Sequence, residues 1–292
     1  MNKRQLLQCI LACSLVFSIF IMQAVQAAGL GVLSPKGIIA HQERKLMFDT
    51  LALMLIVVLP VIVMSFAFAY RYKATKRLGS YHPDWSHNTL LEAFWWGIPG
   101  VIVLVLAYIV WHKTHELDPY KTINVKGDIE EVQVVALRWK WLFIYPKEGI
   151  ATINDLHLPV NKQFSFQITA DSPMSSFDIP QLGGQIYAMA GMRTKLHLYT
   201  THKGIYEGLN TQLNGDGFSM MHFKTHVVSQ KAFDRWVEHV KQNSKALSLS
   251  EYKTLYEPNV GMPPVHFSSV QNDLFQKIMA QYKQKNRWLH SW

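Results

Sequence analysis

Histidines and cysteines are the residue types with which this chain could build a metal site. The sequence contains 13 histidines but only two cysteines, Cys9 and Cys13, so the rest of the chain cannot form a site with several thiolate ligands. His222 and His226 have the four-residue spacing that pairs ligands on a helix. Their segment has a two-residue period, however, and on a strand rising ~3.3 Å per residue they would be roughly 13 Å apart. We therefore predict two solvated strand histidines here and no metal site.

A carboxylate at the edge of a long apolar segment is a second candidate for chemistry. Glu92 directly precedes an uncharged run, and Thr89-Leu90-Leu91-Glu92 has the pattern of a capping box, in which the carboxylate satisfies a free N–H at the start of a helix. Ionisable groups at membrane edges also mark proton and ion pathways. The two roles are compatible, because a capping carboxylate keeps one oxygen free.

Three apolar segments organise the first third of the chain. Residues 1–27 have a positively charged start, an apolar middle and small residues placed for cleavage after Ala27; they predict a signal peptide, with an uncleaved leader helix as the alternative. The segments at about 50–69 and 93–111 are uncharged and long enough to cross a ~30 Å hydrocarbon core. We therefore expect residues 28–117 to form a two-helix transmembrane hairpin.

Charge supports this expectation and orients the hairpin. Charged residues make up 17% of the chain, below the ~25% typical of soluble domains. The net charge of +9 accompanies long apolar runs, which favours a lipid partner over nucleic acid. Lysine and arginine cluster within residues 70–92, and the positive-inside rule places this loop in the cytoplasm. Both flanks, and all that follows residue 117, then lie outside.

Residues 118–229 predict a β-sandwich. Phe164, Phe166 and Ile168 alternate with polar residues, and similar short runs are separated by glycine and proline, a pattern typical of antiparallel sheets. Nine strands are expected, at 131–137, 139–145, 150–156, 163–170, 174–179, 185–190, 193–199, 204–209 and 222–228. From residue 230 to 292 the period favours a helical arm, with helices at 231–242 and about 270–283.

Two segments resemble subunit II of the haem–copper terminal oxidases. The first is the aromatic strand RWKWLFIYP at Arg138–Pro146, and the second is SFDIPQLGGQIYAMAGM at Ser176–Met192. The similarity extends from about Pro35 to the last helix and is greatest to the quinol-oxidising, bo-type branch of the family. It implies that the sandwich is cupredoxin-like and that the C-terminal arm is the aromatic-rich extension of that branch. The expected fold is thus a membrane α-helical hairpin followed by an all-β cupredoxin-like sandwich with C-terminal helices.

The resemblance also bears on copper. In the branch that oxidises cytochrome c, the sandwich carries a binuclear copper centre bridged by two thiolates, because soft sulfur holds copper against harder competitors. The matching positions here are Ser175, Asn210, Gln212, Asn214 and Phe218, with only the thioether of Met221 retained. The resemblance therefore implies that the copper site is absent and that this chain binds no metal.

Two further roles come from the resemblance. Trp139 and Trp141 are expected on one side of a strand. In the copper-bearing branch the matching aromatic region passes electrons in from cytochrome c. In this chain, without copper, we expect the two tryptophans to have a role in packing or subunit contact. In this family a glutamate in text similar to Trp85–Ala93 lies at the mouth of a proton pathway into subunit I. Glu92 is therefore the candidate for proton entry, and no catalytic residue is expected on this chain.

The resulting hypothesis is a non-metal subunit II of a proton-pumping ubiquinol oxidase, which oxidises ubiquinol and reduces dioxygen to water. Haems and copper would lie in the partner subunit I, and further small membrane subunits would complete the complex, without cytochrome c or nucleic acid as partners. The expected location is a bacterial-type inner membrane, crossed more than once, with the large C-terminal domain in the periplasm. The alternatives are a copper-bearing cytochrome c oxidase subunit II, disfavoured because no cysteine follows Cys13, and a membrane-anchored periplasmic binding module.

Overall fold

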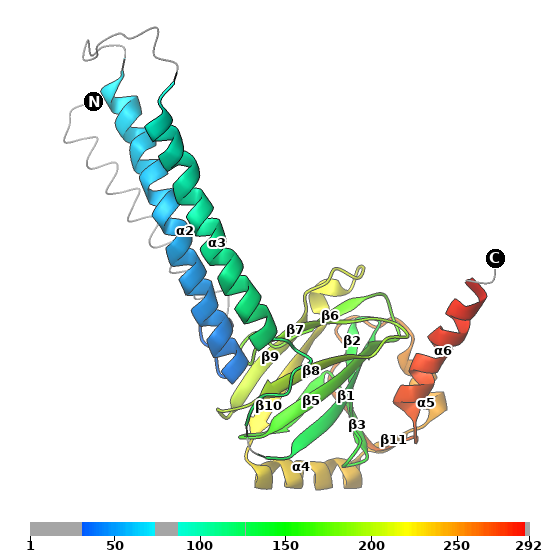
Figure 1. The fold of residues 1–292 in the computed structure, drawn as a ribbon. Helices are drawn as coiled ribbons and strands as arrows, with labels where there is room; N and C mark the ends of the chain where they lie inside the picture. Colours follow the sequence, from blue (N-terminus) through cyan, green and yellow to red (C-terminus); the bar gives the residue numbers. More distant parts are fainter. Residues whose placement is uncertain (1–30, 74–86, 126, 290–292) are drawn as a thin grey trace, which may run out of the picture. The chain divides into compact units, whose positions relative to one another are not determined.

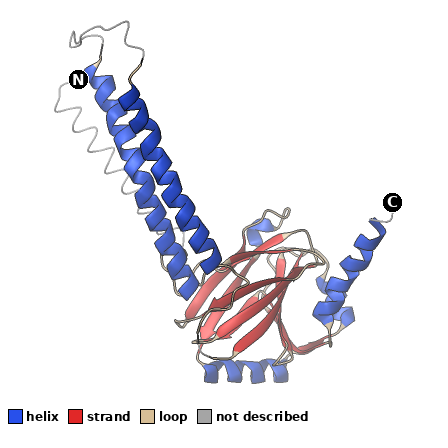
Figure 2. Cartoon of the chain, viewed as in Figure 1, coloured by secondary structure: helices blue, strands red, loops and turns tan. Residues whose placement is uncertain are grey.

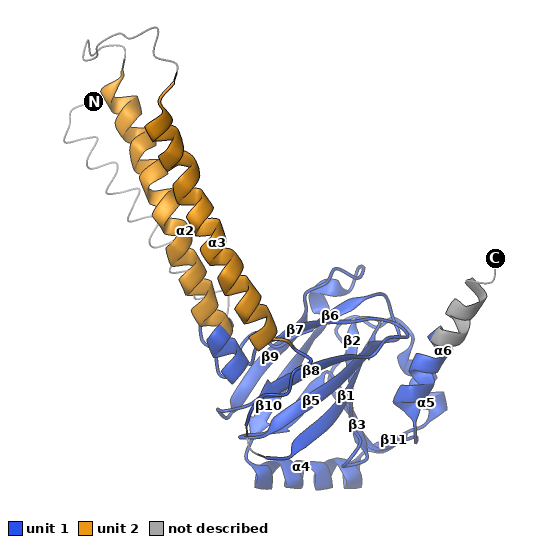
Figure 3. Ribbon diagram, viewed as in Figure 1, with its two compact units in different colours: residues 1–42, 119–292 blue, residues 43–118 orange. Residues whose placement is uncertain are grey.

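A computed structural model describes residues 31–73, 87–125 and 127–289 of the chain (Figure 1). The chain divides into two compact units, which Figure 3 distinguishes by colour. One unit comprises residues 43–118, and the other comprises residues 119–292 together with those before residue 43. The expected signal peptide, residues 1–27, lies outside the described residues.

The smaller unit is helical. Helix α2 (Ile38–Arg71) and helix α3 (Thr89–Glu116) both extend beyond the apolar runs that predicted them, because polar residues continue each helix at its ends. Both are long and apolar enough to cross a membrane. Large apolar side chains point outward along both of them, including Phe66, Trp96 and Leu104. Such a surface requires lipid or another apolar chain around it.

The larger unit is a sandwich of two sheets (Figure 2). A seven-stranded sheet has the order β11-β12-β3-β2-β1-β5-β8, and a five-stranded sheet has the order β4-β10-β9-β6-β7. The strands are β1 (Ile129–Leu137), β2 (Lys140–Tyr145), β3 (Ile150–Ile153), β4 (Asp155–Pro159), β5 (Gln163–Ala170), β6 (Ser175–Asp178), β7 (Gln185–Ala188), β8 (Thr194–Tyr199), β9 (Gly204–Asn210), β10 (His222–Val228), β11 (Lys245–Leu247) and β12 (Val265–Val270).

The strand pattern predicted antiparallel sheets, but some of the strand pairs are parallel. β1 pairs in parallel with β5, and β4 pairs in parallel with β10. The strand expected at 150–156 is in fact two, because Asn154 adopts φ of 54° and separates β3 from β4. These two strands then join different sheets. Alternation of residue types reports which face is buried, but it does not report the partner strand or its direction.

The C-terminal arm also differs from the prediction. Helix α4 (Gln230–Asn243) forms where expected, and helix α5 (Leu249–Leu255) and helix α6 (Leu274–Leu289) follow. The arm nevertheless contributes two strands: β12 pairs with β3 and β11 with β12. The last helix begins at Leu274, four residues later than predicted, since Val265–Val270 is extended along the sheet edge.

Two apolar cores lie on opposite faces of the seven-stranded sheet. Alternate residues of β1 and β2, such as Val134 and Phe143, enter the first core between the sheets, which α4 closes. Their neighbours, such as Val135 and Leu142, enter a second core beneath α5 and α6. The carboxylate of Asp171, which is buried, accepts hydrogen bonds from the hydroxyls of Tyr252 and Tyr282 in the arm. The arm is therefore part of the folded domain.

The segment just before the membrane helices is held by the sandwich. The backbone N–H groups of Lys36 and Gly37 donate to the carbonyl of Gln181 at 2.6 and 3.0 Å, and Ala40 is buried. Gly183 adopts φ of 98°, and a Cβ there would lie 2.4 Å from the backbone nitrogen of Ala40. Gly183, in the second family-like segment, therefore has a structural role, because it allows the two backbones to approach closely.

Candidate functional site

The positions that match copper ligands are gathered at one end of the five-stranded sheet. Ser175 begins β6, Asn210 ends β9, and Met221 immediately precedes β10. The amide nitrogen of Asn214 donates to Ser175 Oγ at 3.0 Å and contacts Met221 Sδ at 3.3 Å. The structure therefore brings three of these side chains into direct contact.

The other three matching positions support the same loop. Asn210 Oδ1 accepts from the backbone N–H of Ser176 at 2.8 Å and of Gln212 at 3.0 Å, while its Nδ2 donates to the carbonyl of Gln212 at 2.8 Å. Phe218 takes part through its backbone, because its carbonyl accepts from the N–H of Met221 in a short 3-10 turn. These bonds connect β6, β9 and the loop before β10.

The atoms that could bind a metal at this site are either hard ligands or already take part in hydrogen bonds. They are amide and hydroxyl groups and one thioether, whereas a binuclear copper centre needs soft, bridging thiolates. The amide of Asn214 occupies the acceptor atoms of both Ser175 and Met221. Among the described residues, Asn214 Oδ1 is one of four buried side-chain polar atoms that lack a hydrogen-bond partner. The residues present do not fit a copper centre. Their contacts instead connect β6, β9 and the loop before β10.

The two tryptophans differ in position from the prediction. Only Trp141 lies on a strand; Trp139 occupies the turn between β1 and β2 with φ of 60°, because the hairpin reverses there. Trp141 is fully buried and contacts Phe177 and Phe223 edge-on at 5.4 and 5.8 Å between ring centroids. Trp139 packs at the edge of the same core and covers Gly217, where a Cβ would lie 2.3 Å from the indole. Both side chains therefore have packing roles, and Trp139 covers the loop that carries Asn214.

Glu92 lies at the start of α3 but is not part of a capping box. The N-cap is Asn88, whose side chain accepts from the N–H of Leu91 at 3.1 Å. Because the cap comes one residue earlier than predicted, Glu92 is one position too far along the helix to reach back to it. Its carboxylate instead pairs with His87 Nδ1 at 2.8 Å, and His87 Nε2 lies 3.2 Å from Thr89 Oγ1. The result is an exposed carboxylate–imidazole pair at the start of α3.

The sequence analysis did not predict a cluster of Asp155, His157 and His226. The prediction that His226 is a solvated strand histidine is wrong. The His226 ring nitrogen lies 3.3 Å from the Asp155 carboxylate, and the ring stacks on that of His157 at 4.6 Å between centroids. His222 is exposed beside Glu207, as expected. The register of β4 against β10 places His226 opposite His157, and such a pairing of distant strands has no local signal. The two-residue spacing of Asp155 and His157 was the only sequence indication.

These features define a class: a membrane-anchored protein with two apolar helices, a cupredoxin-type sandwich outside the membrane and a C-terminal helical arm. Residues 110–228 match the family described as cytochrome c oxidase subunit II, periplasmic domain, and residues 241–286 match the cytochrome oxidase aromatic-rich motif.

The curated relatives narrow the class. The chain is 46% identical to cytochrome bo(3) ubiquinol oxidase subunit 2 of Pseudomonas aeruginosa, over 86% of this chain and 76% of that protein. It is 45% identical to the Pseudomonas putida protein of the same name, over 88% and 82% of the two chains. Its identity to ubiquinol oxidase subunit 2 of Acetobacter aceti is 44%, over 87% and 83%. The chain therefore belongs to the ubiquinol oxidase subunit 2 family of the haem–copper oxidases, which confirms the family inferred from Arg138–Pro146 and Ser176–Met192.

Proposed function

We propose that this chain is subunit II of a proton-pumping ubiquinol oxidase and that it lacks the binuclear copper centre. The complex oxidises ubiquinol and reduces dioxygen to water, with its haems and copper held by subunit I. The observation that carries the proposal is the contact of Asn214 with Ser175 and Met221, which fills with neutral hydrogen-bonding groups the place where a copper centre needs thiolates. The printed names of the relatives support the quinol as substrate.

The absence of a copper relay is consistent with this substrate. Ubiquinol is lipid-soluble and can deliver electrons to subunit I within the membrane, so no electron needs to pass through the sandwich from cytochrome c. The role of the chain is then structural. Its two apolar helices dock on subunit I, on smaller membrane subunits and on lipid, and its sandwich lies in the periplasm.

Glu92 is the residue to which we assign a part in proton uptake. The Glu92–His87 pair is exposed, with side-chain exposures of 56% and 62%, and it lies at the end of α3 that follows the lysine- and arginine-rich loop. A carboxylate there can collect protons from the cytoplasm and pass them to a channel in subunit I. The imidazole of His87 lies 2.8 Å from this carboxylate and places a second polar group at the same entrance.

Copper content tests the proposal. The complete oxidase, purified from its membrane, should show no mixed-valence binuclear copper signal in electron paramagnetic resonance and no purple thiolate-to-copper absorption after copper is added. A variant in which the four ligand positions are restored, with Ser175→His, Asn210→Cys, Asn214→Cys and Phe218→His, is the positive control for detection. A stoichiometric mixed-valence signal from the unaltered chain would overturn the non-metal assignment and favour the copper-bearing alternative.

Topology provides an independent check. In a background with Cys9 and Cys13 replaced by serine, Lys231→Cys should react with a membrane-impermeant maleimide in cells with a permeable outer membrane. Lys73→Cys should react only after the inner membrane is opened, because the positive-inside rule places its loop in the cytoplasm. Both positions are exposed, so burial does not limit their labelling. The reverse pattern of labelling would contradict the orientation and, with it, the assignment of Glu92 to the cytoplasmic side.

A further inference from the structure

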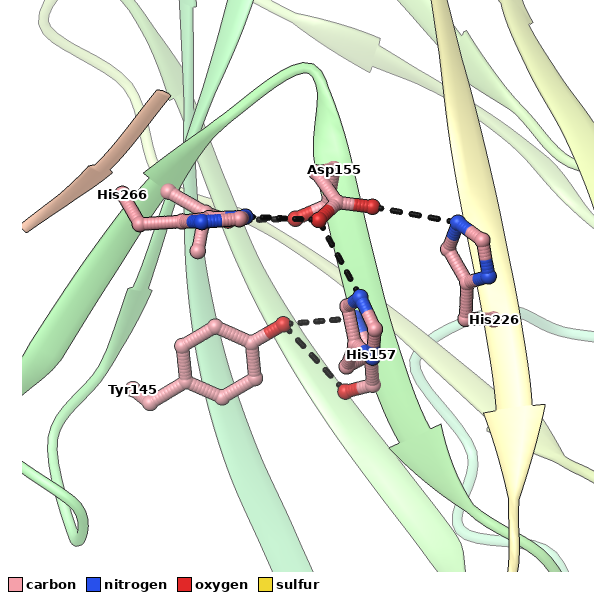
Figure 4. Close-up of polar contacts among 6 residues, drawn as sticks. Tyr145, Asp155, His157, His226 and His266 are labelled. Carbon is pink, nitrogen blue, oxygen red and sulfur yellow. Dashed lines mark hydrogen bonds and ion pairs between the residues drawn. The ribbon is translucent and has the colours of Figure 1, made fainter. Parts of the chain in front are cut away.

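Three imidazoles converge on one buried carboxylate in a part of the sandwich that the oxidase role does not use (Figure 4). Asp155 and His157 come from β4, His226 from β10 and His266 from β12. The Nε2 atoms of His157 and His266 lie 3.1 and 2.7 Å from Asp155 Oδ2, and that of His226 lies 3.3 Å from Oδ1. All three rings therefore direct the same nitrogen at one acceptor group.

The fold holds these side chains from several directions. Parallel pairing of β4 with β10 sets His226 opposite His157, and pairing of β12 with β3 sets His266 opposite Thr152. The hydroxyl of Tyr145 accepts from the backbone N–H of His157 at 2.8 Å and donates to its carbonyl at 3.2 Å. Trp236 of α4 stacks on the His157 ring at 4.0 Å between centroids. The cluster is thus prearranged, as a binding site requires.

Three of the four side chains are spaced nearly closely enough for a shared tetrahedral ion. Ligand atoms at ~2.0–2.2 Å from zinc are roughly 3.3–3.5 Å from one another. The ligand atoms of Asp155, His157 and His226 all lie within 4.8 Å of one another. His266 Nε2 lies 2.7 Å from Asp155 Oδ2 but outside that group, so its side chain must move toward the other two imidazoles for all four to share an ion. The side chains of His226 and His266 are 25% and 32% exposed, which leaves a route of entry from solvent.

We propose that Asp155, His157, His226 and His266 bind one divalent transition-metal ion, with Zn²⁺ as the expected species. Three histidines and a carboxylate complete a four-coordinate shell from the protein alone, which is the arrangement of a structural rather than a catalytic zinc site. The ion would join β12, which belongs to the C-terminal arm, to β4 and β10 of the sandwich. Its effect would be to stabilise the attachment of the arm, independently of electron transfer.

The test uses the full chain in detergent, without a polyhistidine tag and stripped with a chelator. Titration with ZnCl₂, followed by calorimetry, should show one equivalent bound with a Kd of about 1 µM or tighter, together with a rise in unfolding temperature. His226→Gln and His266→Gln should each weaken binding by tenfold or more and abolish the rise. His222→Gln is the matched control, because this histidine lies on the same strand but faces Glu207, and it should bind as the unaltered chain does.

Glutamine keeps a hydrogen-bond donor toward Asp155, so the variants should remain folded, and circular dichroism checks this. Co²⁺ absorption by the unaltered chain provides a readout that needs no variant: intense visible bands are expected from tetrahedral coordination. Absence of those bands, or Zn²⁺ binding that is equal in the unaltered chain and in the His226→Gln and His266→Gln variants, would overturn the proposal. The cluster would then be a set of hydrogen bonds that satisfies a buried carboxylate.

Discussion

Phe177→Ala is expected to lower the free energy of unfolding by about 3–5 kcal/mol, the cost of a large cavity in a packed core. Phe177 is fully buried and lies at the centre of the aromatic cluster between the two sheets. Its ring stacks on Phe223 at 5.2 Å and meets Trp141 at 5.4 Å and Phe166 at 5.6 Å between centroids. Because these neighbours come from several strands, they cannot move together to fill the space. Chemical denaturation of the chain in detergent, followed by tryptophan fluorescence, measures the change.

Tyr187→Ala is the matched control for this prediction. Tyr187 lies on β7, directly beside β6, but its side chain is exposed. Its removal creates no cavity, and its effect should stay within about 0.5 kcal/mol. A loss below ~1 kcal/mol for Phe177→Ala would mean that the core can collapse around the missing ring, contrary to the rigid packing argued here.

Glu92→Gln is expected to slow quinol oxidation several-fold while the complex still assembles with full haem content. The substitution keeps the size of the side chain but removes the group that takes up a proton and pairs with His87. The helix cap should persist, since it is formed by Asn88 and does not involve the Glu92 side chain. Glu92→Asp should have a milder effect because it remains ionisable. Oxygen consumption with ubiquinol, normalised to haem, is the measurement.

Glu116→Gln serves as the control for loss of a charge on the same helix. Glu116 lies at the opposite end of α3, where it pairs with Lys113, and its replacement should leave turnover unchanged. Equal turnover of Glu92→Gln and the unaltered complex, at equal haem content, would remove Glu92 from the proton pathway. Equal slowing by both variants would point to a general effect of charge on the helix.

Strand β5 shows what the alternation of aromatic and polar residues can predict about burial and what it cannot. Phe164, Phe166 and Ile168 enter the first core. The polar residues that alternate with them, Ser165 and Gln167, are buried as well. On the neighbouring strand β8, His197 contacts the carbonyl of Pro119 through both its ring and its backbone. At β8 the second face of the sheet is thus contacted by the segment at Pro119, which local patterning does not identify.

The sequence by itself determined the two apolar helices, most of the strands, helix α4 and, through two short segments, the family. These features depend on the residue types within a few positions of one another, and burial or solvation of each residue leaves a local record. Tertiary structure alone decided the parallel strand pairs and the contact of Trp139 with the loop of Asn214. It also decided that His157, His226 and His266 meet at Asp155. Each of these contacts joins segments far apart in the sequence and depends on the register between their strands, and a shift of one residue would move the side chains to another face.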